Sequence, residues 1–119
     1  MTEEPTTDEV TIYHNPRCST SRKAVDAVAG ATVVPYLKEP LDAPALRHLL
    51  DILQDPATDL VRRDARFAAL GLGEDDVASA DQVVDVLVAH PELMQRPVLV
   101  RGERAIIGRP PERVASFMA

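Results

Sequence analysis

A chain of 119 residues, with 45% hydrophobic and 27% charged residues, has the length and composition of one globular domain, which excludes a disordered or fibrous protein. Its net charge of −6 argues against broad binding to a nucleic acid backbone, which requires a basic face. One cysteine cannot form an internal disulfide, and no apolar run approaches the ~20 residues of a membrane span. Residues 1–8 are polar and acidic, unlike a signal peptide, so we expect a flexible leader on a cytoplasmic protein without membrane contact.

The beginning of the chain predicts a strand, a helix and a second strand. Residues 9–14 alternate along a β-branched run, and this pattern predicts a short strand. Residues 19–30 carry apolar side chains at helical spacing and predict a helix that closes at Gly30. Residues 32–37 predict the second strand. Because Pro35 has no N–H for a sheet ladder, we expect that strand near a sheet edge.

The middle of the chain predicts a block of helices. Asp42 is a favourable N-cap residue ahead of a leucine-rich stripe with helical spacing. Ser79 and Gln82 form the signature of a capping box, in which side chains and backbone N–H groups at a helix start bond reciprocally. The helical stretches expected in this block cover residues 43–53, 59–72 and 83–90.

The C-terminal part predicts a hairpin and a last helix. Residues 96–100 and 105–108 predict two strands joined by a turn, and residues 110–119 predict a helix with proline in its first turn. The resulting order is strand-helix-strand, a helical block, then strand-strand-helix. We therefore expect an α/β protein with a thioredoxin-like fold, formed by residues 9–119, with a helical insertion between its βαβ and ββα halves.

The sole cysteine, Cys18, follows the first strand and directly precedes the first helix. A free thiol has a pKa near ~8.5, so only about 3% is thiolate at pH 7. Unpaired N–H groups at a helix start lower that pKa, and no carboxylate occurs from residue 10 to residue 25. The nearby cationic side chains are Arg17, Arg22, Lys23 and, when protonated, His14. This environment favours a reactive thiolate and also suits an oxyanion.

Other roles of Cys18 are less well supported by the sequence. A buried cysteine that acts as a small apolar core residue remains an alternative. One Cys and three scattered His lack the spacing of metal ligands, so we expect no metal site. A phosphatase-type loop requires an arginine six residues after the cysteine, but position 24 is alanine and Arg22 is only four residues away.

Four motifs follow one another along the chain: TIYHNPRCSTSRKA, LVRR, HPELMQRPVLV and IGRPPERV. In this order and at these separations they resemble the glutaredoxin-dependent arsenate reductase (ArsC-like) family, from about residue 10 to the C-terminus. We expect no extension after the last predicted helix, which makes the chain similar to a shorter branch of that family. The resemblance implies a thioredoxin-like fold with a helical insertion, and a single cysteine that attacks arsenate.

The resemblance also implies roles for individual residues. It assigns the nucleophile to Cys18 and a thiolate-favouring role to His14, four residues earlier. Pro97 matches the cis-proline that lies beside the reactive thiol in thioredoxin-like folds. Several guanidiniums must offset the repulsion between a thiolate and arsenate, and arginine can hold two oxygens at once. The family's three arsenate-binding arginines match Arg62, Arg96 and Arg109.

Three further arginines remain alternatives. Arg63 or Arg66 fits the position matched to Arg62 about equally well. Arg22 lies on the first turns of the predicted helix and is either a substrate ligand or a surface cation.

The expected function is reduction of arsenate to arsenite by the Cys18 thiolate. Ser21 stands where a dithiol motif has its second cysteine, so no thiol of the chain can resolve a mixed disulfide on Cys18. We therefore expect no bound cofactor, glutathione or another small thiol as co-substrate, a glutaredoxin-like partner and a monomeric enzyme. The alternatives are a monothiol thiol-disulfide oxidoreductase that is not specific for arsenate and, ranked lowest, an Spx-like redox regulator.

Overall fold

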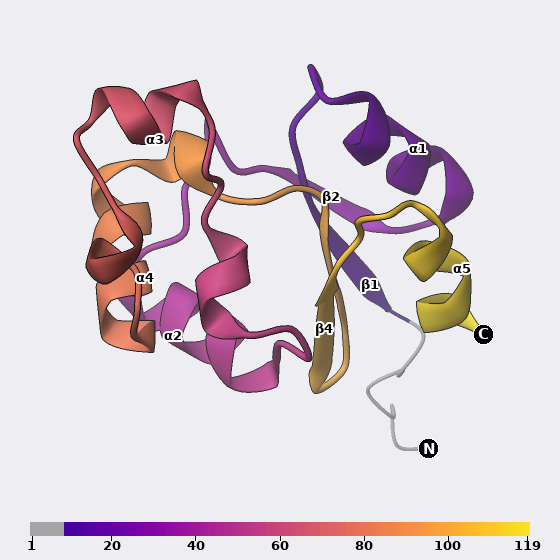
Figure 1. The fold of residues 1–119 in the computed structure, drawn as a ribbon. Helices are drawn as coiled ribbons and strands as arrows, with labels where there is room; N and C mark the ends of the chain where they lie inside the picture. Colours follow the sequence, from indigo (N-terminus) through magenta and orange to yellow (C-terminus); the bar gives the residue numbers. More distant parts are fainter. Residues whose placement is uncertain (1–8) are drawn as a thin grey trace.

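Four short strands form a mixed sheet in the computed structural model, which describes residues 9–119 (Figure 1). The leader expected over residues 1–8 lies outside the described residues. The strands are β1 (Val10–His14), β2 (Thr32–Pro35), β3 (Val98–Arg101) and β4 (Arg104–Ile107). Their order in the sheet is β2-β1-β3-β4. β1 pairs in parallel with β2, whereas β1–β3 and β3–β4 are antiparallel.

The position of β2 confirms the expectation from its proline. β2 is an edge strand, and Pro35 is its last residue, opposite His14 of β1. Since parallel neighbours require a crossover, the chain passes through α1 (Ser19–Ala27) between them. α1 ends before the predicted boundary at Gly30, which takes φ +79° in the turn that leads into β2.

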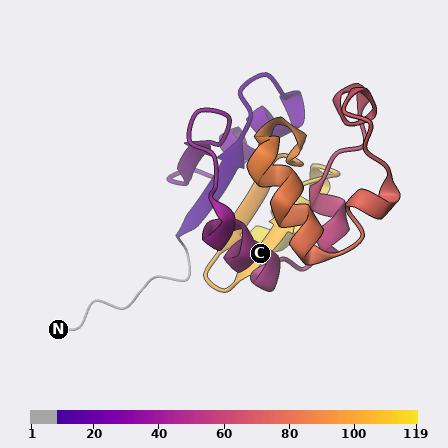
Figure 2. The same ribbon diagram turned by 90° about the vertical axis from the view of Figure 1, so that its left-hand side faces the viewer.

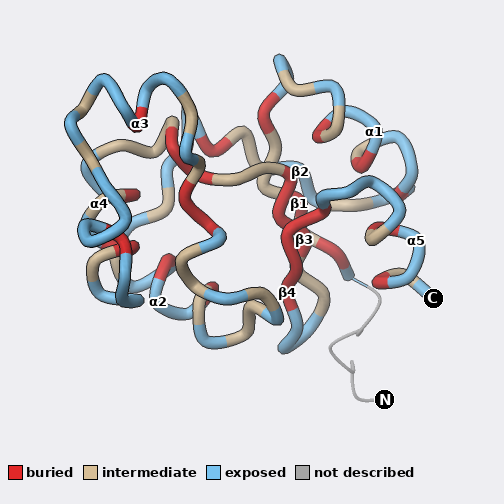
Figure 3. Tube along the Cα trace, in the orientation of Figure 1, coloured by how far each residue is buried: buried red, intermediate tan, exposed pale blue. Residues whose placement is uncertain are grey.

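Helices cover both faces of the sheet (Figure 1). On one face, α1 and α5 (Glu112–Met118) pack over Ile12, Leu99 and Ile106, which are almost completely buried. On the other face lies the helical block, with α4 and α2 in front of the sheet in Figure 2. Its elements are α2 (Ala43–Ile52), η1 (Ala57–Leu60), α3 (Ala65–Ala69), η2 (Glu74–Asp76), α4 (Ala80–Ala89) and η3 (Pro91–Leu93). Buried segments run along β1, β3 and β4 between these layers (Figure 3).

Two of the predicted helix starts are confirmed. The carboxylate of Asp42 accepts the N–H of Ala45 at 3.0 Å at the start of α2. At the start of α4, Ser79 accepts the N–H of Gln82 at 3.2 Å, and the Gln82 side chain accepts the N–H of Ser79 at 3.1 Å. These bonds satisfy N–H groups that have no partner inside the helix.

The helix predicted over residues 59–72 is wrong. The chain forms η1, then an extended stretch over residues 61–64, and α3 is short. The stretch is extended because it bonds to a distant segment: Arg62 N–H donates to the Leu93 carbonyl at 2.8 Å, and Gln95 N–H donates to the Leu60 carbonyl at 2.7 Å. These tertiary bonds outweigh the helical propensity of the stretch.

The C-terminal part forms the predicted hairpin and helix. Gly102 takes φ +62° in the turn between β3 and β4, a conformation that favours glycine. The Arg96–Pro97 peptide bond is cis. The βαβ and ββα units joined by a helical block constitute a thioredoxin-like fold with a helical insertion. No helix within residues 9–119 is long and apolar enough to cross a membrane.

Candidate active site

The turn between β1 and α1 places Cys18 at the start of the helix. Cys18 is the N-cap residue of α1, with an extended backbone at φ −98° and ψ 121°. Its N–H donates to the Asn15 carbonyl at 3.0 Å, and its carbonyl accepts the N–H of Arg22 at 3.0 Å. The thiol is partly exposed. A reactive thiol at this position is accessible to a small molecule and lies at the positive end of a helix.

Two arginines from the C-terminal half of the chain reach this thiol. Nη1 of Arg109 lies 3.7 Å from Sγ of Cys18 and 3.2 Å from the backbone carbonyl of Arg96. The side chain of Arg96 also lies close enough to the sulfur to stabilise its charged form. Both arginines precede cis peptide bonds, to Pro97 and Pro110. Although they are far apart in the sequence, Cys18, Arg96 and Arg109 thus meet in one site.

The environment of Cys18 lowers its pKa from the ordinary value of a thiol. Partial burial has the largest effect and acts in the opposite direction, because it disfavours the charged form. The backbone N–H of Ser21 and the guanidiniums of Arg96 and Arg109 together outweigh burial, because they stabilise the thiolate. The site therefore holds a larger fraction of reactive thiolate at neutral pH than a free cysteine.

The side chain of His14 contacts Ser21. Its Nδ1 lies 2.6 Å from Oγ of Ser21, which also accepts the backbone N–H of Asn15 at 3.0 Å. Burial, and then the positive charge of Arg22, lower the pKa of His14, so the imidazole is neutral at pH 7. A lowered pKa reduces the positive charge that His14 contributes near Cys18, and its expected role in favouring the thiolate stays a prediction.

Ser21 is fully buried on α1, and its hydroxyl links the helix to His14 at the end of β1 and to Asn15 in the turn before Cys18. Sequence reasoning treated it as a missing second cysteine, and thereby missed its structural role together with that of Asn15. Asn15 is also buried, and its Oδ1 accepts the N–H of Arg17 at 2.9 Å. An asparagine that precedes a proline in a turn is the sequence signal for such a side-chain-to-backbone bond.

The contacts of Arg22 and Arg62 within the described residues are with groups other than the thiol. Arg22 is exposed on α1 and donates to the Pro16 carbonyl at 2.8 Å. Arg62 lies on the extended stretch of residues 61–64. This stretch bonds to residues 93–95, the segment that directly precedes Arg96. Its Nε lies 3.6 Å from a carboxylate oxygen of Asp64. Within residues 9–119, neither Arg22 nor Arg62 donates a hydrogen bond to Cys18.

Arg63 and Arg66, the alternatives to Arg62, are bonded elsewhere. Arg63 donates to both carboxylate oxygens of Glu74, at 3.0 and 2.9 Å, and to Thr58 at 2.6 Å. Arg66 donates to Glu92 at 2.9 Å. Their guanidiniums are therefore engaged in bonds within the helical block, whereas the ion pair of Arg62 is longer.

Tyr36 is a further residue of the site that the sequence did not single out. Its side chain is completely buried, and its hydroxyl donates to the Met94 carbonyl at 3.2 Å. Burial raises the pKa of Tyr36, and the neighbouring Arg96 and Asn15 partly offset this effect. The sequence feature that could have indicated Tyr36 is a tyrosine directly after β2 in a chain with only 3% aromatic residues.

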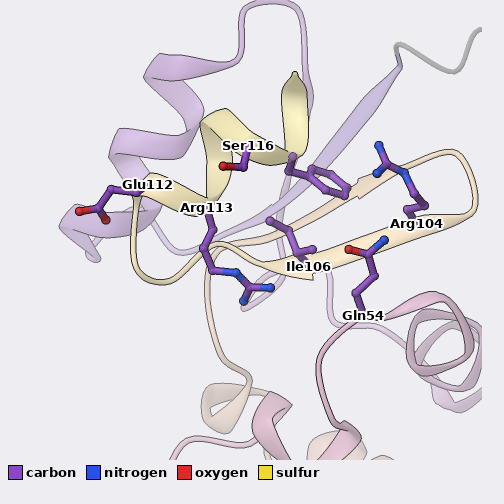
Figure 4. A pocket seen from close by; sticks show the side chains of 7 residues that line it. Gln54, Arg104, Ile106, Glu112, Arg113 and Ser116 are labelled. Carbon is purple, nitrogen blue, oxygen red and sulfur yellow. The ribbon is translucent and has the colours of Figure 1, made fainter.

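Two cavities differ in whether a predicted site residue lines them. One, of about 440 Å³, is lined by Arg109 together with Asp55, Gln95 and Arg113. The other, of about 420 Å³, lies between β4 and α5 (Figure 4), and none of the predicted site residues lines it. In the described part of the chain, no group of three or more His, Cys, Asp and Glu is arranged to hold a metal ion.

The model of the ArsC family matches residues 13–117. The chain belongs to the ArsC family. Among its relatives, the "Uncharacterized protein YfgD" of Escherichia coli strain K12 is 40% identical, over 94% of this chain and 98% of that protein. An arsenate reductase of Escherichia coli is 33% identical, over 92% of this chain and 80% of its own length.

A solved structure of this kind comes from Vibrio cholerae. This arsenate reductase superposes with a TM-score of 0.80 and 31% identity, over 91% of this ArsC family chain and 96% of its own. The thioredoxin-like fold with its helical insertion is thus shared with a family member of nearly the same length. The fold and the family expected from the sequence are both confirmed.

Proposed function

We propose that this ArsC family protein reduces arsenate to arsenite, with Cys18 as the nucleophile. The observation that carries the proposal is the meeting of Arg109 with Cys18, Nη1 to Sγ 3.7 Å, beside the side chain of Arg96. Arsenate and a thiolate repel each other, and two guanidiniums at the sulfur offset that repulsion. The arsenate reductases among its relatives support the same substrate.

The chemistry requires two thiols. The Cys18 thiolate forms a bond to arsenic, and one arsenate oxygen takes up protons and leaves as water. A small thiol then attacks the adduct, a sulfur–sulfur bond forms, and the electron pair of the sulfur–arsenic bond stays on arsenic. In sum, HAsO₄²⁻ and two thiols give HAsO₃²⁻, a mixed disulfide on Cys18 and water. Arsenic(V) becomes arsenic(III), and the two sulfurs are oxidised.

The second thiol comes from outside the chain. Cys18 is the only cysteine, and the position of a resolving cysteine holds the buried Ser21. Glutathione or another small thiol supplies the attacking sulfur in this proposal, and a glutaredoxin-like partner reduces the mixed disulfide by thiol exchange. Arg96 and Arg109 hold the arsenate oxygens, and Arg62 is the third proposed ligand.

The test is arsenate-dependent turnover. Protein, glutathione, glutaredoxin, glutathione reductase and NADPH are mixed, or the corresponding mycothiol system is used, and NADPH oxidation is followed after arsenate is added. Arsenate should start NADPH oxidation, and Cys18→Ser should abolish it. Turnover that persists in Cys18→Ser, or no turnover with either thiol system, would overturn the proposal. Reduction of a small mixed disulfide without any arsenate turnover would favour a monothiol oxidoreductase instead.

A further inference from the structure

Ile107, the last residue of β4, lies two residues before Arg109, and side chains bond its backbone at the outer edge of the sheet. The segment after α2 runs beside β4 there: Leu53 pairs with Ala105, and Gln54 N–H donates to the Ala105 carbonyl at 2.8 Å. Figure 4 shows Gln54 near Ile106 of β4, below α5. At Pro56 the segment can no longer donate a backbone bond. The next outward-facing backbone groups of β4, those of Ile107, therefore need side-chain partners.

Asp55 and Arg113 supply these partners. Oδ2 of Asp55 accepts the Ile107 N–H at 2.9 Å, and Nη1 of Arg113 donates to the Ile107 carbonyl at 2.8 Å. The two side chains also pair with each other, Nη1 of Arg113 to Oδ1 of Asp55 at 2.8 Å. The Asp55 side chain is only 14% exposed, so this pair is partly shielded from water.

The next residue, Gly108, is bonded on the opposite side of the strand, towards the interior of the sheet. Gly108 N–H donates to the Pro97 carbonyl at 2.8 Å. The backbone that leads into Arg109 is thus bonded on both sides, to Asp55 and Arg113 outside and to Pro97 inside. Arg109 lies on the exposed connection between β4 and α5, and its guanidinium contacts the sulfur of Cys18. Its position beside the sulfur therefore depends on the bonds that fix the preceding backbone.

We propose that Asp55 and Arg113 form a clasp that positions Arg109 beside Cys18. The clasp touches neither the thiol nor the proposed substrate; it acts through the backbone of Ile107. Asp55, Arg109 and Arg113 also line the same cavity of about 440 Å³, so a displacement of the clasp opens space into which Arg109 can turn. The part of this inference that concerns arsenate affinity rests on the proposed function; the part that concerns the thiol does not.

The experiment measures the Cys18 thiolate directly, by its ultraviolet absorbance as a function of pH, in the absence of arsenate. Asp55→Asn keeps an oxygen for the Ile107 N–H but removes the charge that faces Arg113, and Arg113→Gln removes the guanidinium. Each variant should raise the pKa of Cys18 towards that of Arg109→Ala. In the arsenate assay, each should raise KM for arsenate about fivefold, through a weakened charge-assisted bond, with a smaller change in kcat.

Two comparisons and the choice of temperature separate positioning from general loss of structure. The double variant should resemble the stronger single variant, because the two residues act as one unit. Asp81→Asn breaks the exposed Arg47–Asp81 ion pair and should leave the Cys18 pKa and the arsenate KM at their original values. All titrations are made well below the lowest melting temperature of the variants.

An unchanged Cys18 pKa in folded Asp55→Asn and Arg113→Gln would overturn the inference, even if their melting temperatures fall. An equal pKa shift in Asp81→Asn would overturn it as well. A shifted thiol pKa in a protein without arsenate turnover would support the clasp and reject the proposed function. Because the first readout needs no arsenate, the two failures are distinguishable.

Discussion

The guanidinium of Arg109 hydrogen-bonds to the sulfur of Cys18 across 91 positions of the sequence. Cys18 comes from the start of α1 and Arg109 from the connection between β4 and α5. The contact therefore exists only when the βαβ and ββα halves have assembled on one sheet. The thiolate is therefore stabilised by the complete fold, through Arg96 and Arg109, in addition to the local N–H of Ser21.

Replacing Arg109 with alanine should raise the pKa of Cys18, because the variant loses a hydrogen bond and a positive charge at the thiolate. The pH profile of iodoacetamide alkylation measures this pKa and should shift to higher pH. Arg109→Lys keeps the charge but not the planar guanidinium, so it should shift the profile less while still impairing arsenate turnover. An alkylation profile of Arg109→Ala that overlays the original would contradict the contact.

The sequence predicted the fold well wherever local patterns and tertiary packing agree. The β-branched strand at residues 9–14, the caps at Asp42 and Ser79 and the edge position of β2 all follow from local chemistry. The stretch over residues 61–64 was missed because its conformation depends on two long-range bonds, from Arg62 N–H to the Leu93 carbonyl and from Gln95 N–H to the Leu60 carbonyl. Such long-range bonds leave no periodic signal in the sequence.

In the candidate site, too, local sequence patterns indicated some residues, whereas others become evident only from tertiary contacts. Cys18 was evident from its position and from the absence of neighbouring carboxylates, whereas Arg96 and Arg109 were indicated only by family motifs. The lowered pKa of His14 results first from burial, which sequence spacing does not reveal, and then from the positive charge of Arg22. Tyr36 was missed because its neighbours, Asn15 and the segment from Met94 to Arg96, are distant from it in the sequence.

The depressed pKa of Cys18 should make stability depend on pH. A thiol whose pKa is lower in the folded than in the unfolded state stabilises the fold fully above the unfolded value of ~8.5, and this contribution disappears as pH falls through the folded value. The free energy of unfolding of the original protein, relative to Cys18→Ser, should therefore rise from pH 6 to pH 9. Urea denaturation at several pH values measures it. A difference that falls over this range would show that the folded pKa is raised instead.

Ser21→Ala should destabilise the protein by about 1–3 kcal/mol, because it leaves the buried N–H of Asn15 without its acceptor and His14 without its partner. Thermal or urea unfolding measures the change. Ser19, exposed at the start of the same helix, offers a matched control, and Ser19→Ala should change the free energy of unfolding by less. Equal effects of the two substitutions would refute a special role of the Ser21 hydroxyl.

Gly108→Ala should also destabilise the fold, by about 1–3 kcal/mol, through overpacking. A Cβ at this position would lie 2.9 Å from Cδ1 of Leu99 and 2.9 Å from Cγ of Pro97, and both side chains are fully buried. A Cβ at Gly73 would have its nearest neighbour 4.0 Å away, so Gly73→Ala serves as the control and should be nearly neutral. Melting temperatures of the two variants measure the difference; if they coincide, the packing around Gly108 is looser than the distances indicate.

The third proposed arsenate ligand can be identified by comparing Arg62→Ala with Arg63→Ala. Arg63 is bonded to Glu74 and Thr58, so its removal should lower the melting temperature and leave KM for arsenate nearly unchanged. Within residues 9–119, the side chain of Arg62 has the longer ion pair with Asp64, and its backbone lies beside the segment that leads into Arg96. Its removal should raise KM for arsenate about tenfold or more, the loss expected for a charge-assisted bond to an oxyanion, with little change in melting temperature. The reverse pattern in KM would assign the ligand to Arg63, which would then have to leave Glu74 when arsenate binds.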